Sequence, residues 1–374
     1  MKRILCVLGT RPEAIKMAPV ISALAARPDQ FFQVVCTTGQ HREMVDDVLR
    51  VFAIRPQIDL DLMTVGQTPL AVAGKIFSCM EEVFADVRPD WVVVQGDTTT
   101  AMAVSLAAFY TGISVGHVEA GLRTYDRLEP FPEEINRRIT DLVSDLYFAP
   151  TSRSKQNLED EGIPSDRIVL TGNTVIDALL SVADRPLDDH WSTYFRELGE
   201  RRLVLVTAHR RENFGRPHRE AFRALRGIAL AYEDSVRILY PVHPNPAVAG
   251  PAAEALGGIP NIDLVSPLDY VTMAQVMRRS SLIVTDSGGL QEEAPSLGVP
   301  VLVLRDVTER PEAVEAGTAR LVGTDHDTIT KGIRLLLDDA GIYREMAQAR
   351  NPFGDGHASE RIVEALAGTA AGPI

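Results

Sequence analysis

The chain has 374 residues, of which 45% are hydrophobic and 24% are charged, a composition typical of a globular protein. At roughly 100–200 residues per domain, this length predicts two or three domains. The net charge of −13 argues against nucleic acid or an anionic membrane as a partner, because both repel an acidic chain at long range.

The first half of the chain alternates short apolar runs with longer amphipathic stretches. RILCVLG precedes a predicted helix from about Pro12, and FQVVCTTG, WVVVQGD, SVGHVEAG, LYFAP and IVLTGN are each followed by a helical pattern. This β–α alternation predicts a parallel sheet covered by helices.

A polar stretch that contains a proline, Asp184–Glu200, interrupts the alternation, which then restarts with RLVLVTAH and continues through VPVLVLRD. The pattern predicts an α/β protein with two doubly wound, Rossmann-like domains. We place the domains at residues 1–172 and 173–374. The tail GHASERIVEALAGTAA predicts a C-terminal helix, a candidate to pack back on the N-terminal domain.

Signals for export or for structural metal sites are weak. The apolar run Ile4–Leu8 is too short for a signal-peptide core, and no run reaches the roughly 18 apolar residues of a membrane span. Cys6, Cys36 and Cys79 form no CxxC pair, which favours buried thiols in a reducing compartment over disulfides or a thiolate zinc site. We therefore expect a cytoplasmic protein without a disulfide framework or a thiolate zinc site.

Ligands of open α/β sheets bind at the carboxyl ends of the strands, so the polar residues that follow each strand are candidates for the site. In GTRPEAIK, Thr10 and Glu13 have capping-box spacing, and Arg11 and Lys16 lie on the first helical turns. This arrangement suits an oxyanion, although a capped helix with surface cations would look the same. The chain has neither a GxGxxG fingerprint nor a Walker loop.

Three carboxylates of the first half stand at the end of a predicted strand or at the start of a predicted helix. Asp97 follows the strand WVVVQ, where it could also cap a helix. Glu119 lies among apolar residues at the end of a strand, and a buried carboxylate there is costly unless it is paired or used. Glu133 follows Pro132 at a helix start and could serve the helix dipole alone.

Cations and glycines follow the strands of the second half. His209 stands in HRREN, His243 follows ILYPV, and Arg310 stands in RDVTERPEA. The segment TDSGGLQEE predicts a tight turn at Ser287, Gly288 and Gly289 whose N–H groups could hold a diphosphate, with Glu293 in reach of ribose hydroxyls. Together with the carboxylates of the first half, these residues predict a nucleotide-diphosphate pocket.

These motifs carry a resemblance to a known family. GTRPEAIKMAP, GDTTT, GHVEAGLRT, PEEINRR, TGNTVIDAL, HRREN, TDSGGLQEEAPSLG and RDVTERPEAVEAGT resemble the non-hydrolysing UDP-N-acetylglucosamine 2-epimerases from Gly9 to about Gly356. The resemblance implies a GT-B-like fold with an active-site cleft that two Rossmann-like domains face, and a homodimer without metal or nicotinamide cofactor. It also implies reversible conversion of UDP-GlcNAc to UDP-ManNAc, which supplies ManNAc for surface polysaccharide.

The resemblance assigns roles to particular positions. It implies that Asp97, Glu119 and Glu133 are catalytic, and His209 could assist the leaving phosphate. The positions that match UDP contacts are Arg11, Lys16, His209, Ser287, Gly288, Gly289, Glu293 and Arg310. Parts of a second, activating UDP-GlcNAc site are matched by Gln40, His41, Gln67 and His243, but Gly66 stands where some relatives carry arginine.

The remaining carboxylates of the stretch from Gly116 to Arg138 are expected to have no catalytic role. We expect Asp126, Glu129 and Glu134 to be loop and helix-surface charges, while Arg123, Arg137 and Arg138 could hold the carboxylates or the loop.

The C2 proton of the sugar has no neighbouring carbonyl to acidify it. An enzyme must therefore oxidise an adjacent carbon or eliminate the group at C1, and the absence of a dinucleotide fingerprint favours elimination. The family mechanism eliminates UDP to give 2-acetamidoglucal and then adds it back. The alternatives are a GT-B glycosyltransferase, a hydrolysing epimerase that releases ManNAc and UDP, and a nucleotide-sugar sensor. A metal-dependent transferase is weaker, because the Asp59–Asp61 DxD spacing lies in an apolar run.

Overall fold

The computed structural model describes residues 1–39, 42–62 and 66–370. The chain forms two compact units, one of Met1–Ala178 with Phe353–Ile374 and the other of Leu179–Pro352. Sequence patterning placed the division at 172/173, whereas the contacts place it inside helix α7 (Thr174–Ala183) and return the end of the chain to the first unit.

Unit 1 is built on a seven-stranded sheet whose recorded strand pairs are all parallel. The spatial order is β3-β2-β1-β4-β5-β6-β7, the doubly wound order with one added strand. The strands are β1 (Lys2–Leu8), β2 (Phe31–Thr37), β3 (Ile58–Asp59), β4 (Trp91–Gln95), β5 (Ser114–Val118), β6 (Leu146–Ala149) and β7 (Ile168–Leu170).

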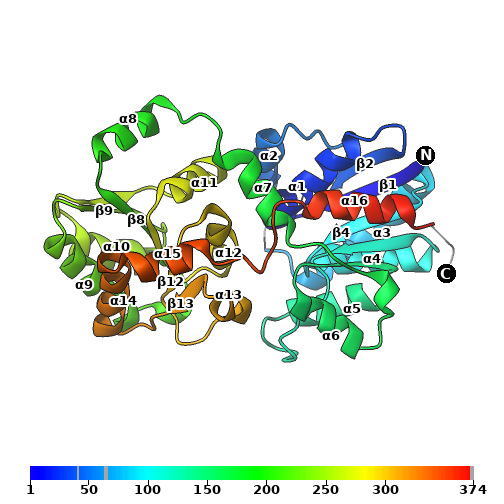
Figure 1. Cartoon of the computed structure of the whole chain (residues 1–374). Coiled ribbons are helices and arrows are strands. Elements are labelled where there is room, and N and C mark those ends of the chain that lie inside the picture. The colour runs from blue at the N-terminus through cyan, green and yellow to red at the C-terminus, as the bar shows by residue number, and fades with distance from the viewer. Residues whose placement is uncertain (40–41, 63–65, 371–374) are drawn as a thin grey trace. The chain divides into compact units, whose positions relative to one another are not determined.

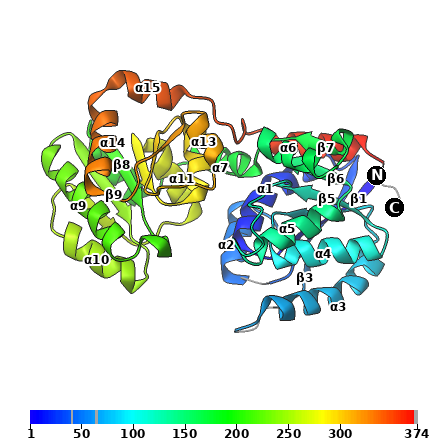
Figure 2. The same cartoon turned by 90° about the horizontal axis from the view of Figure 1, so that it is seen from below.

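Helices cover both faces of this sheet. Residues of α1, α2 and α16 pack against Ile4, Cys6 and Trp91, while residues of α3 and α4 pack against Leu5, Val7 and Val92. Side chains alternate across a strand, so these two sets of strand residues point to opposite faces of the sheet. The two groups of helices therefore cover opposite faces (Figure 2). The helices are α1 (Arg11–Ala25), α2 (Arg42–Val51), α3 (Pro69–Val87), α4 (Thr99–Tyr110), α5 (Glu133–Leu142), α6 (Ser152–Asp160) and α16 (Ala358–Gly368), with a 3₁₀ turn, η1 (Ser165–Arg167).

The C-terminal helix α16 belongs to unit 1 and lies beside α1 (Figure 1). Lys2 donates through Nζ to the backbone carbonyls of Leu366, Ala367 and Thr369 at 2.6, 2.7 and 2.6 Å, which satisfies the exposed carbonyls at the end of this helix. At the other end, Asp177 accepts the backbone N–H of Ser359 at 2.8 Å.

Unit 2 has a six-stranded parallel sheet in the order β10-β9-β8-β11-β12-β13, which repeats the doubly wound pattern. Its strands are β8 (Arg202–Thr207), β9 (Val236–Pro241), β10 (Ile262–Val265), β11 (Leu282–Thr285), β12 (Val301–Val303) and β13 (Ala319–Leu321). Val204, Val206 and Tyr240 face a core built with α9, α10 and α14, and α11 contacts β8.

The helices of unit 2 are α8 (Asp189–Leu198), α9 (Arg216–Ala231), α10 (Pro246–Leu256), α11 (Tyr270–Arg279), α12 (Gly288–Glu293), α13 (Pro311–Glu315), α14 (His326–Asp338) and α15 (Ala340–Gln348), with 3₁₀ turns η2 (Arg211–Asn213) and η3 (Ala294–Leu297). Helix α8 occupies the stretch that interrupted the sequence pattern. Asp188 caps it by accepting the Trp191 N–H at 2.8 Å, and its aromatic residues pack on one another.

No helix within the described ranges is long and apolar enough to cross a membrane.

Candidate active site

Each sheet reverses its strand order between its first and fourth strands, which is where ligands bind in doubly wound folds. In unit 1 these strands are β1 and β4, which lead into Gly9–Thr10 and Gly96–Asp97. In unit 2 they are β8 and β11, which lead into His209 and Ser287. Thr10, Asp97, His209 and Ser287 therefore lie at the switch point of their own sheet.

Glu119 stands directly after β5 with a backbone φ of +67°, a region that non-glycine residues seldom adopt. Its side chain is 7% exposed and pairs with Lys16 Nζ at 2.5 Å. Gln95 Nε2 donates to the same carboxylate at 2.9 Å. One cation and one amide thus compensate the burial of this charge, which places Lys16 and Glu119 in one cluster.

Asp97 is held by helix α5. Arg137 Nη2 contacts its carboxylate, and Asn136 Nδ2 donates to its backbone oxygen at 3.0 Å. The Asp97 side chain stays 29% exposed, so it remains accessible to a ligand. Sequence patterns assign no role to Asn136 and leave the role of Arg137 open.

The expectation for Glu134 was wrong. Glu134 is completely buried, not a helix-surface charge. It accepts the backbone N–H groups of Thr124 and Tyr125 at 3.1 and 3.2 Å and pairs with Arg137 at 3.2 Å. Glu134 therefore binds the loop before α5 to the helix. The Thr124 and Tyr125 N–H groups come close to it only when the loop is folded, so the sequence alone does not predict this contact.

Glu133 and Arg11 each begin a helix and are half-buried. Neither side chain forms a hydrogen bond or ion pair with another residue in the described part of the chain. A carboxylate and a guanidinium without internal partners are available to a ligand, which suits the roles that the resemblance implies.

Glu13 confirms the predicted capping box but does more than cap. It accepts the Thr10 N–H at 2.7 Å, the Gly9 N–H at 3.2 Å and the Thr98 hydroxyl at 2.8 Å. Burial raises its pKa to about 7, although these hydrogen bonds oppose the shift. Glu13 therefore connects the loop after β1 to the loop that carries Asp97.

In unit 2, Asp286 organises the loop that carries His209. The buried carboxylate accepts the N–H groups of His209 and Arg210 at 2.9 and 2.8 Å, and His209 Nδ1 lies 3.4 Å from it. Burial would raise the pKa of Asp286, but His218 and these N–H donors lower it overall. Partial burial lowers the pKa of His209, and Asp286 offsets only part of that shift. Asp286 stands in the quoted TDSGG segment, yet the sequence did not single it out.

The Ser287–Gly289 turn opens α12 beside Arg210. A Cβ added to Gly288 would lie 3.5 Å from Arg210 Nη2, so this guanidinium lies against the turn. Arg210 and Arg305 pair with Glu309 at 3.3 and 3.5 Å. Arg310 pairs with Glu292, a partner that the sequence did not predict. Glu293 lies at the last residue of α12 and is half-buried.

The residues proposed for a second ligand have mixed outcomes. Gln40 and His41 lie outside the described residues. Gln67 is half-buried and follows Gly66, whose φ is +71°. His243 stacks against His209 with ring centroids 5.8 Å apart, so it lies next to a candidate catalytic residue.

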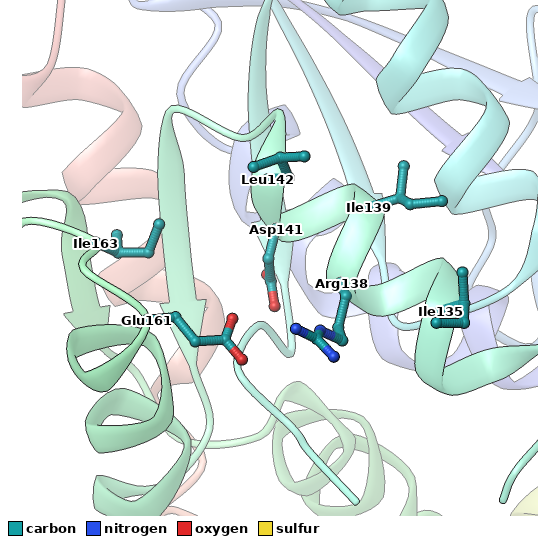
Figure 3. Close-up of a pocket in the computed structure, with 7 residues that line it drawn as sticks. All are labelled: Ile135, Arg138, Ile139, Asp141, Leu142, Glu161 and Ile163. Carbon is teal, nitrogen blue, oxygen red and sulfur yellow. The ribbon is translucent and has the colours of Figure 1, made fainter. Parts of the chain in front are cut away.

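A separate hollow of about 400 Å³ lies beside α5 and is shown in Figure 3. Ile135, Ile139 and Leu142 give it an apolar wall, and Arg138, Asp141 and Glu161 lie around it. None of the candidate catalytic residues line it. Within the described parts of the chain, no group of three or more His, Cys, Asp or Glu residues has the geometry of a metal site.

Comparison with known proteins supports the family resemblance over nearly the whole chain. Residues 22–367 match the family described as UDP-N-acetylglucosamine 2-epimerase. The UDP-N-acetylglucosamine 2-epimerase of Escherichia coli strain K12 is 50% identical over 373 residues, covering 97% of this chain and 98% of its own.

Two solved structures are also similar. A putative UDP-N-acetylglucosamine 2-epimerase from Listeria monocytogenes is 46% identical with a TM-score of 0.93, over 97% of this chain and 95% of its own. The UDP-GlcNAc 2-epimerase from Neisseria meningitidis, solved bound to UDP-GlcNAc, is 45% identical with a TM-score of 0.86, over 97% of this chain and 99% of its own. These likenesses confirm the GT-B-like α/β class, and the chain belongs to the UDP-N-acetylglucosamine 2-epimerase family.

Proposed function

We propose that the protein reversibly converts UDP-N-acetylglucosamine to UDP-N-acetylmannosamine by inverting C2, without hydrolysing the nucleotide sugar. Family membership over the whole chain supports the substrate. The observation that carries the chemistry is Glu119, a buried carboxylate at a positive φ whose side chain contacts Lys16 and Gln95.

The reaction begins with elimination. The C1–O bond breaks, its electron pair leaves with UDP, and the C2 proton passes to a base, which leaves the C1–C2 double bond of 2-acetamidoglucal. Protonation of C2 on the opposite face and re-addition of UDP at C1 complete the inversion. Each face needs an acid or base, and Asp97, Glu119 and Glu133 of unit 1 are the proposed set.

Unit 2 supplies the groups for the leaving diphosphate in this proposal. Arg310, His209 and the N–H groups at Ser287–Gly289 would stabilise the charge that develops on UDP, and Glu293 would contact the ribose. Arg11 and Lys16 add cations from unit 1. We also propose that the protein acts as a homodimer in the cytoplasm and supplies ManNAc units for surface polysaccharide.

The rival functions differ in what happens to the sugar. A glycosyltransferase requires an acceptor and leaves the C2 proton in place. A hydrolysing epimerase gives free ManNAc and UDP. Proton NMR of the protein with UDP-GlcNAc in D₂O, without metal or nicotinamide, separates the three.

The proposal expects UDP-ManNAc to appear, with deuterium at C2 in both epimers. Free ManNAc would identify the hydrolysing reaction. If neither proton exchange nor a new sugar appears, even with a trace of UDP-GlcNAc added to a UDP-ManNAc reaction to fill an activating site, the epimerase proposal is wrong.

A further inference from the structure

His117 is a completely buried histidine in β5, two residues before Glu119. Its Nδ1 lies 2.6 Å from Asp141 Oδ1, and its Nε2 lies 2.7 Å from the backbone oxygen of Gly96. Both ring nitrogens are therefore at hydrogen-bond distance from oxygen atoms, one in α5 and one in the loop after β4.

The chemistry of these partners fixes the protons on the ring. A backbone carbonyl can only accept a hydrogen bond, so Nε2 must carry a proton. An ionised carboxylate can also only accept, so Nδ1 must carry a second proton if Asp141 is ionised. A neutral imidazole has one N–H and cannot satisfy both contacts.

The surroundings of Asp141 keep it ionised. Its Oδ2 accepts Arg123 Nη1 at 2.7 Å and the Gly121 N–H at 3.3 Å. Burial alone would raise the pKa of Asp141, whereas the Arg123 guanidinium in contact with its carboxylate acts to lower that pKa. A protonated Asp141 would place a neutral acid beside a buried guanidinium, which is the costlier arrangement.

The charges continue outward in alternating sign. Arg123 has a side chain with no exposed surface, and it holds Glu161 through Nε and Nη2 at 2.8 and 2.7 Å, a bidentate pair. Asp141 and Glu161 lie on neighbouring sides of the hollow in Figure 3. The row runs from His117 through Asp141 and Arg123 to Glu161, so each buried charge has an opposite neighbour.

We propose that His117 is held permanently as an imidazolium and acts as a positioning residue for the carboxylates that follow β4 and β5. The positioning role rests on the proposed function, whereas the protonation state does not. Its Nε2–H bond fixes the Gly96 carbonyl, directly before Asp97, and a charge-assisted bond does this more firmly than a neutral one. Its Nδ1–H bond ties the same point to α5, the helix whose Arg137 and Asn136 hold Asp97.

The charged groups around His117 are accounted for. Asp141 faces it from α5, Arg123 stands behind Asp141 from the loop after β5, and Glu161 closes the row at the end of α6. Asp97 follows Gly96, whose carbonyl contacts His117, and Glu119 stands two residues after His117. These two carboxylates pair with Arg137 and Lys16. The second proton is therefore balanced by a carboxylate in direct contact.

The direct test is ¹⁵N NMR of the histidine rings in the native full-length protein from about pH 6 to about pH 9, on both sides of the ordinary histidine pKa of ~6.5. We expect both His117 nitrogens to show N–H shifts and couplings across this range. One nitrogen with the shift of an unprotonated imidazole at neutral pH would overturn the assignment.

Two variants test whether the charge of Asp141 keeps the second proton on the His117 ring. Asp141→Asn removes the balancing carboxylate and should make His117 lose its second proton within the same pH range. The matched control, Glu161→Gln, removes the outermost charge of the row and should leave the ring doubly protonated. A ring that stays doubly protonated in Asp141→Asn would overturn the role given to Asp141.

The positioning role is tested by kinetics of His117→Gln, with the conversion of UDP-GlcNAc as readout. Glutamine keeps a donor but carries no charge, so we expect kcat to fall about tenfold or more while KM changes by less than about threefold. Unchanged kcat would overturn the positioning role. If the wild-type protein shows an imidazolium but no epimerisation, the proposed function fails and the charge assignment stands.

Discussion

At the scale of single residues, Glu119 combines burial, a positive φ and a lysine partner. Glu119→Gln keeps the size and the hydrogen-bonding capacity of the side chain but cannot take up a proton. We expect the rate of C2 deuterium exchange to fall by about 10²–10⁴-fold, the usual contribution of a general acid or base. Glu129→Gln, in the exposed loop, is the control and should exchange at the wild-type rate. Equal rates for both variants would remove Glu119 from the chemistry.

Glu13 makes a prediction about pH and stability. Burial raises its pKa from an ordinary 4.5 to about 7, so the folded chain holds a proton that the unfolded chain has lost between these values. The stability that this group contributes must therefore fall as the pH rises from about 4.5 to about 7.

The measurement is denaturant unfolding of the wild type and Glu13→Gln across this range. At about 1.4 kcal/mol per pKa unit, the wild type should lose up to about 3 kcal/mol relative to the variant by pH 7. Stability curves that run parallel for the two proteins would show that Glu13 does not titrate in this window.

At the scale of elements, Gly121 determines how closely the loop after β5 approaches α6. It has a φ of +85°, and an added Cβ would lie 2.2 Å from the Ser154 carbonyl oxygen. Gly162 has a similar φ of +88° but open space around it. We expect Gly162→Ala to cost about 1 kcal/mol from backbone strain alone and Gly121→Ala more than about 3 kcal/mol. Thermal unfolding of both variants gives the comparison, and equal losses would contradict the close approach.

The turn into α12 gives a second prediction at this scale. A Cβ on Gly288 meets only Arg210 Nη2, at 3.5 Å, so Gly288→Ala should leave the thermal midpoint unchanged. If the diphosphate of UDP binds at this turn, the methyl group should raise the Kd for UDP about tenfold or more. Calorimetric titration with UDP measures this, with Gly227→Ala as a control that also has open space. An unchanged Kd would move the diphosphate away from Gly288.

At the scale of the whole molecule, unit 1 is completed by the end of the chain. Ile362, Val363 and Leu366 of α16 are fully buried in the core formed with α1. A chain that ends at Pro352 would expose this core and remove the acceptors of Lys2, at a cost of about 5 kcal/mol or more. Its thermal midpoint should fall sharply relative to that of the wild type. Equal midpoints would mean that unit 1 is stable without α16.

Sequence periodicity was enough to predict the two α/β units. The alternation of buried and exposed positions can be recognised within each strand or helix, without knowledge of the rest of the chain. The same is true of the Thr10–Glu13 capping box and of the helix Ala358–Gly368, whose signals span a few residues. The carboxylates at strand ends were also found in this way, since parallel strands bring their carboxyl ends to one edge.

The partners of those carboxylates were decided only by the tertiary structure. Arg137 and Asp97 are 40 residues apart, and Gln95 and Glu119 are 24 apart, so no local pattern pairs them. Glu134 looks in sequence like its exposed neighbours, and its burial depends on a loop that folds back over it. His117 reads as one residue of an apolar strand, and its charge depends on one oxygen atom in α5 and another in the loop after β4. Periodicity determines which face of an element is buried, but a charge is stabilised by atoms within a few ångströms, which come from distant parts of the chain.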